Sequence, residues 1–81
     1  MNYGFVQSVQ ERYPPGTRIE LLDLNYPVPG LLPHTMGTVK YVDEYAGIVC
    51  DFDNGHSCTI LPGMDRFRRA YNKPRSFQWE R

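Results

Sequence analysis

Residues 47–61 read GIVCDFDNGHSCTIL, and this stretch decides the fold. Its DNG tripeptide is a strong hairpin signal between two runs of alternating apolar residues. A two-residue turn would pair Cys50 with Thr59, whereas a three-residue loop with Gly55 in a left-handed bulge pairs Cys50 with Cys58. Only the bulged register places both apolar sets on one face, namely Ile48, Cys50 and Phe52 with Cys58 and Ile60. The stretch therefore predicts a bulged hairpin with facing cysteines.

Upstream of the hairpin, residues 17–21 alternate polar and apolar side chains. This period of two predicts a strand with Ile19 and Leu21 pointing inward. The alternation slips at Leu22, which predicts a bulge or bend.

A loop and two more strands complete the predicted sheet. Residues 25–36 contain three prolines and cannot form a regular strand or helix, so we expect a long, stiff, apolar loop. Residues 38–42 predict a strand with Val39 and Tyr41 on one face. After a single helical turn, residues 67–71 predict a short closing strand.

The N-terminus favours a short helix. Its apolar residues follow the period of one helix face, and they are Phe5, Val6, Val9 and Tyr13. The consecutive prolines at 14 and 15 end this helix.

These elements predict a mainly β protein, a small SH3-like five-stranded barrel with a short N-terminal helix and a basic C-terminal tail. The chain has 81 residues with 41% hydrophobic and 14% aromatic content, which describes one small domain rather than a two-domain enzyme. We expect a helical extension at 1–13, the barrel at 14–71 and a basic, aromatic tail at 72–81.

Membrane and secreted classes are not favoured. The longest stretch without a charged residue covers residues 24–39, and it is too short and too rich in proline for a membrane helix. The first residues, MNYGFVQSVQER, lack the basic start and apolar run of a secretory signal. We therefore expect a cytoplasmic protein.

The order of signals over residues 14–67 resembles domain of unknown function 4314, a family of short bacterial and phage domains common on mobile elements. The segments that carry the resemblance are PGTRIEL at 15–21, the proline-containing loop, MGTV at 36–39, DFDNG at 51–55 and LPGMDRF at 61–67. Family members commonly have Trp where this chain has Phe52, which keeps an inward aromatic side chain. The resemblance implies an SH3-like barrel of phage or mobile-element origin, and it supplies no activity or site to transfer.

Catalytic and metal-binding arrangements are weakly indicated. Two reduced core thiols are the favoured interpretation of the cysteines. A zinc site would have to add His34 and His56 to them, and the close spacing of a zinc knuckle is missing. No spacing selects a Ser57-based triad, and the carboxylate pairs lie at predicted turns. We expect no enzymatic activity, no cofactor or metal, and no small-molecule substrate.

Charge is divided along the chain although the formal net charge is zero. Residues 1–65 carry three basic and eight acidic side chains, a balance of −5, whereas residues 66–81 carry a balance of +5. A basic end favours a phosphate backbone or an acidic partner. Alternatively, the basic segment folds back onto the acidic domain.

Two binding surfaces follow from these patterns, and the choice between nucleic acid and a host or phage protein stays open. Nucleic acid or an acidic partner would be bound by the cations and the stacking ring of the basic segment, namely Arg66, Arg68, Arg69, Lys73, Arg75 and Trp79. A host protein, for example a defence component, would be bound by the proline-stiffened loop through Tyr26 and Leu31. The simpler interpretation of this loop is that it covers an open end of the barrel.

Overall fold

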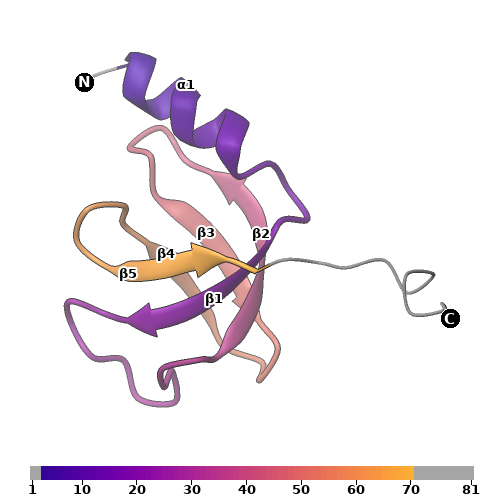
Figure 1. The fold of residues 1–81 in the computed structure, drawn as a ribbon, viewed down its shortest axis with the longest axis vertical. Coiled ribbons are helices and arrows are strands. Elements are labelled where there is room, and N and C mark those ends of the chain that lie inside the picture. Colours follow the sequence, from indigo (N-terminus) through magenta and orange to yellow (C-terminus); the bar gives the residue numbers. More distant parts are fainter. Residues whose placement is uncertain (1–2, 71–81) are drawn as a thin grey trace, which may run out of the picture.

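A computed structural model describes residues 3–70. Within this range one helix, α1 (Tyr3–Arg12), precedes five strands, which are β1 (Arg18–Asp23), β2 (Met36–Val42), β3 (Ile48–Phe52), β4 (Ser57–Ile60) and β5 (Arg66–Arg69). Figure 1 shows α1 at one end of the sheet and the loop after β1 at the other. None of the helices described in residues 3–70 is long and apolar enough to span a membrane.

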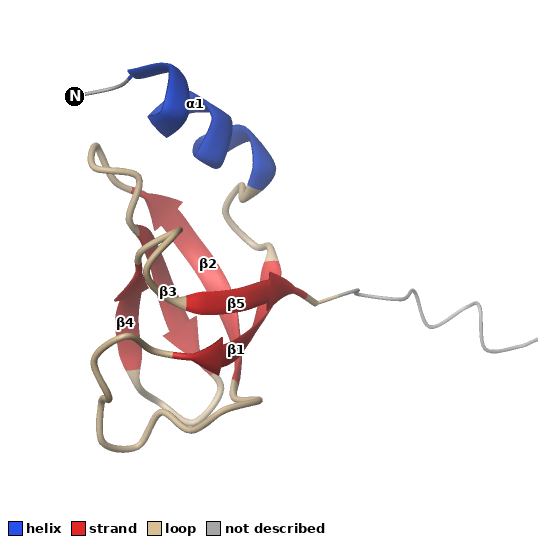
Figure 2. Cartoon of the chain, turned by 60° about the vertical axis from the view of Figure 1, so that its left-hand side comes forward, coloured by secondary structure: helices blue, strands red, loops and turns tan. Residues whose placement is uncertain are grey.

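All described strand pairs are antiparallel, and they form one sheet in the order β4-β3-β2-β1-β5. The sheet curves so that β5 crosses in front of β4 in the view of Figure 1 and in front of β2 in the view of Figure 2. The prediction of a mainly β fold with five strands and a short N-terminal helix is confirmed, but the sheet is not closed, because β4 and β5 form opposite edges and do not pair. The turn between β4 and β5 instead brings β5 beside β1. Within this turn the Asp65 carboxylate accepts a hydrogen bond from the Leu61 N–H at 2.9 Å.

The hairpin prediction is confirmed. Cys50 lies opposite Cys58, and Gly55 has a φ of +94°. In that conformation its N–H donates to the Phe52 carbonyl at 3.0 Å. The Asn54 side chain accepts the His56 N–H at 3.1 Å, so the turn residues satisfy their own backbone.

The core lies on the concave face of the sheet and beneath α1. Ile19 and Leu21 are buried as predicted, and the predicted bulge is confirmed by a register shift between Leu21 and Asp23. The buried hydrophobic residues of the described range are Val6, Val9, Ile19, Leu21, Leu31, Val39, Ala46, Ile48, Cys50, Phe52 and Ile60.

Two predicted core positions are wrong. Tyr41 is exposed although Val39 is buried, because a second register shift between these residues reverses the facing of β2 and turns Val42 inward. Phe5 is 48% exposed, so the buried face of α1 consists of Val6 and Val9 and is narrower than the helical spacing predicts.

Candidate functional site

The loop between β1 and β2 holds a fixed conformation. Hydrogen bonds tie it to the domain along its length, among them the Asn25 N–H to the Asp65 carboxylate at 2.8 Å, the Asn54 side-chain amide to the Gly30 carbonyl at 2.7 Å, and the His34 N–H to the Leu21 carbonyl at 2.6 Å. These contacts lie near its start, middle and end. Because its prolines also fix φ, the loop has little conformational freedom left to lose on binding.

Gly30 sets the path of the loop at its centre. Its φ is +90°, a conformation that side chains rarely adopt. A Cβ atom there would lie 2.3 Å from Nε2 of His56. The sequence therefore needs glycine at this position both for the backbone angle and for the close approach of the β3–β4 hairpin.

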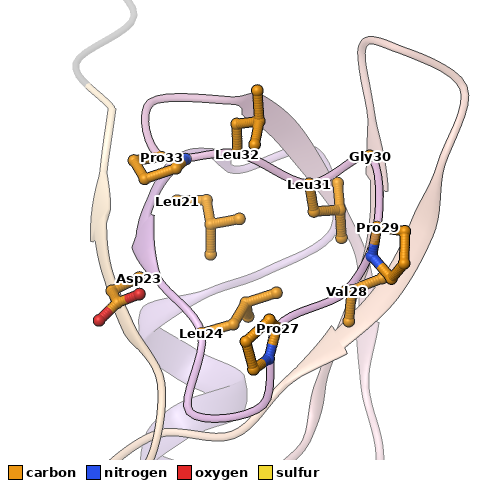
Figure 3. Close-up of a pocket in the computed structure, with 10 residues that line it drawn as sticks. All are labelled: Leu21, Asp23, Leu24, Pro27, Val28, Pro29, Gly30, Leu31, Leu32 and Pro33. Atoms are coloured by element: carbon orange, nitrogen blue, oxygen red, sulfur yellow. The ribbon is translucent and has the colours of Figure 1, made fainter.

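The loop encloses an apolar cavity of about 400 Å³. Figure 3 shows Leu21, Leu24 and Leu31 within the ring that the loop forms, with Asp23 at the rim. The remaining lining residues are Pro27, Val28, Pro29, Gly30, Leu32 and Pro33. Among residues 3–70 the Asp23 carboxylate has no ion-pair partner. The cavity thus combines an apolar wall with one negative charge that forms no ion pair within the described residues.

A second, smaller cavity of about 170 Å³ continues this surface toward β4. It shares Leu24 and Val28 with the first cavity and adds Tyr26, Leu61 and Met64. We call the apolar residues around both cavities the proline-loop surface, and they are Leu24, Tyr26, Pro27, Val28, Pro29, Leu32, Pro33, Leu61 and Met64.

The two loop residues proposed from the sequence differ in their surroundings. Tyr26 is 77% exposed, whereas Leu31 is only 6% exposed and belongs to the core. Its neighbour Leu32 is 69% exposed. A partner can therefore contact Tyr26 and Leu32 directly, and Leu31 acts by holding the loop in place.

Strand β5 carries the described part of the basic segment, and two of its three arginines are engaged within the domain. Nε and Nη2 of Arg68 each lie 2.7 Å from the Glu20 carboxylate, which also contacts Nδ1 of His34 at 2.6 Å. The hydrogen bonds from His34 and then Arg68 lower the pKa of Glu20. The guanidinium of Arg69 lies over the Tyr13 ring at 5.5 Å.

Arg66 is exposed, and no acidic residue within 3–70 forms an ion pair with it. The other cations and the aromatic proposed for nucleic acid are Lys73, Arg75 and Trp79, which lie outside the described residues. The structure therefore brings together Arg66, Arg68 and Arg69 on one strand, where Arg66 lies opposite Asp23 of β1 without forming an ion pair within residues 3–70.

A further ion pair joins β1 to the β3–β4 turn. Nη1 and Nη2 of Arg18 donate to the Asp53 carboxylate, at 2.9 and 2.7 Å. These hydrogen bonds lower the pKa of Asp53. Arg18 also donates to the Thr38 hydroxyl at 2.8 Å, so this arginine supports the sheet and is not free for a ligand.

The cysteines and acidic pairs are built into the fold. Cys50 and Cys58 are free thiols, and burial raises the pKa of Cys50 to about 12. Asp43 accepts the N–H groups of Tyr45 and Gly47, each at 2.8 Å, which is turn chemistry. Within the described range no group of three or more His, Cys, Asp or Glu side chains is arranged to hold a metal ion.

A family model for a domain of unknown function, number 4314, matches residues 2–70. The chain belongs to this family. The match includes α1, which the resemblance at 14–67 leaves out, and the burial of Val6 and Val9 explains why the helix is part of the DUF4314 domain. No curated protein and no solved structure matches the chain.

Sequence reasoning did not find several residues of the proline-loop surface and the cavity rim of this DUF4314 domain. Leu61 ends the stretch that predicts the hairpin and Met64 lies in the single helical turn predicted after it, and only the folded chain brings them beside Tyr26. Asp23 is one of nine acidic residues in the chain, and only its position at the cavity rim distinguishes it from the others. No local signal in the sequence marks these three residues.

Proposed function

We propose that this DUF4314 domain is a non-enzymatic binding module that recognises a protein partner through the proline-loop surface. The observation that carries the proposal is the apolar cavity of about 400 Å³ on a loop fixed by hydrogen bonds along its length. An exposed apolar surface on a small domain is typical of an interaction site, and a fixed loop binds at low entropic cost.

The chemistry of the cavity defines the partner. Its apolar wall suits one aliphatic or aromatic side chain, and the Asp23 carboxylate at the rim, which forms no ion pair within residues 3–70, suits a neighbouring lysine or arginine. We expect Asp23→Asn to weaken binding and to make it less sensitive to salt.

The same proposal includes an SH3-like arrangement, supported by a β1–β4 meander whose first strand also pairs with β5. It also includes a cytoplasmic location and an origin on a phage or other mobile element.

Nucleic acid, or another acidic partner, is the second candidate. It is favoured by the exposed Arg66, which forms no ion pair within residues 3–70 and starts a segment with a charge balance of +5. Its affinity should fall with salt by a logarithmic slope of about 0.7–0.9 for each phosphate neutralised. Arg66→Gln should then weaken binding to all sequences alike.

Affinity capture from the host, with and without nuclease, separates the two candidates. The decisive variant is Tyr26→Ser, and its matched control is Tyr45→Ser, since both tyrosines are mostly exposed and lie on different surfaces. The proposal predicts a nuclease-resistant partner that Tyr26→Ser loses and Tyr45→Ser keeps. A partner that disappears with nuclease and weakens in Arg66→Gln supports nucleic acid and overturns the protein-binding proposal.

A further inference from the structure

The two edge strands of the sheet are protected unequally. Strand β5 carries Arg66, Arg68 and Arg69, and charged side chains on an edge hinder pairing with another chain. Strand β4 consists of Ser57, Cys58, Thr59 and Ile60 and has no charged side chain. The β4 edge therefore lacks the protection that the β5 edge has.

The register shows which β4 backbone groups face away from the sheet. The Phe52 N–H donates to the His56 carbonyl at 2.7 Å, and hydrogen-bonded pairs alternate in an antiparallel ladder. Cys58 and Ile60 therefore bond to β3, and the backbone groups of Ser57 and Thr59 point outward. Within residues 3–70, β4 pairs with no strand other than β3.

Apolar side chains lie beside this edge. Cys58 and Thr59 line the smaller cavity together with Leu61 and Met64, both of which are exposed. The Cys58 thiol lies 3.6 Å from the Thr59 carbonyl, which places its sulfur close to an outward-facing backbone group. A strand added here would bury these apolar groups and satisfy the free backbone groups.

We propose that β4 pairs in antiparallel fashion with β4 of a second copy of this chain. The outward backbone groups belong to Ser57 and Thr59, which lie on either side of Cys58. A two-fold axis at Cys58 therefore places Ser57 of each copy opposite Thr59 of the other copy. The same axis places Cys58 opposite Cys58 of the second copy. The edge is therefore complementary to itself.

Charge also favours a second copy as the occupant. The strands brought together carry no charged residue, so like charges do not face one another across the new pair. The whole chain has a formal net charge of zero, which removes the general repulsion between identical molecules. A dimer at this edge would also cover Leu61 and Met64 of the proline-loop surface, so separate variants test the two proposals, Tyr26→Ser for the partner and Thr59→Lys for the dimer.

Sedimentation equilibrium of the reduced full chain tests the pairing. With rising concentration the average mass should increase from 9.4 kDa toward twice that value. Thr59→Lys places a charge on the edge and should raise the dimer dissociation constant at least tenfold. Gln7→Lys adds the same charge on the exposed face of α1 and should leave the constant unchanged. Thermal melting of each variant verifies that it is folded.

Thiol cross-linking gives an independent readout of the register. Diamide accepts the two electrons and two protons released when two thiols join, so it should trap a disulfide between Cys58 and Cys58 of the second copy. Cys50→Ser should still form the cross-link, whereas Cys58→Ser and Thr59→Lys should not. A mass that stays at 9.4 kDa up to millimolar concentration, or a dimer that a folded Thr59→Lys variant forms equally well, overturns the proposal.

Discussion

The two edge strands differ in charge. Strand β5 carries three arginines, two of which contact other parts of the domain, whereas β4 has no charged side chain and lies beside an apolar surface. In the sequence, the basic strand stands out as the binding element. In the structure, Arg68 is committed to Glu20 and Arg69 to Tyr13. A cluster of charges along the chain is therefore a poor guide to a free charged surface when strands pair over long distances.

Removing the buried anchor of β4 should have the largest effect on stability. Ile60 is fully buried, and Ile60→Ala should lower the free energy of unfolding by about 2–5 kcal/mol, measured by urea denaturation. Phe67→Ala on β5 is the comparison, and it should cost less because Phe67 is only partly buried. An equal or larger loss from Phe67→Ala would show that β5 also depends mainly on the core.

Cys58 should react faster than Cys50. Burial raises the pKa of both thiols, that of Cys50 to about 12, and leaves Cys50 inaccessible, whereas Cys58 is partly exposed at the β4 edge. Native protein treated with iodoacetamide at pH 8 should be labelled at Cys58 first, as peptide mass spectrometry would show. Equal labelling rates, or no free thiol in unreduced protein, would contradict this assignment.

Glycine substitutions test how firmly the proline loop is held. Gly30 and Gly63 both have positive φ, at +90° and +88°, but only at Gly30 would a Cβ atom meet another side chain. Gly63→Ala should cost about 1–2 kcal/mol from the backbone alone. Gly30→Ala should cost about 0.5–1.5 kcal/mol more if the His56 ring must leave its rotamer. The additional loss should disappear in a His56→Ala background, and its persistence there would exclude the His56 contact as its cause.

The local part of the fold was predictable from the sequence. The DNG turn and the alternation around it fix the Cys50–Cys58 register, and the slip at Leu22 indicates the bulge in β1. These features depend on residues close together in the chain, where turn chemistry and the two-residue period act directly.

The edge pairing and the site depend on longer-range contacts. Glu20 and Arg68 are 48 residues apart, and they meet only because β1 pairs with β5. The exposure of Tyr41 depends on a bulge in β2, where its pairing with β3 shifts register, and no turn-forming residue in β2 indicates this bulge. Sequence periodicity shows neither the pairing of β1 with β5 nor the bulge in β2. The side chains that remain exposed for binding could therefore be identified only from the fold.

The smallest effect is the pH dependence of the β5 contact. The pKa of Glu20 lies below its ordinary value of 4.5, because the folded state stabilises its charged form through His34 and Arg68. Its contribution to stability is therefore fully present above pH 4.5 and is lost as the pH falls through the lowered value. Glu20→Gln should reduce the melting temperature at pH 6, and the difference from the unchanged protein should shrink toward zero near pH 2.

Glu44→Gln is the matched control for this titration, because Glu44 is exposed and forms no ion pair within residues 3–70. It should leave the melting temperature nearly unchanged across the same pH range. If Glu20→Gln behaves like Glu44→Gln, the Arg68 contact does not stabilise β5. Arg68 would then be available to a ligand together with Arg66, and the contrast between the two edges would lose its electrostatic basis.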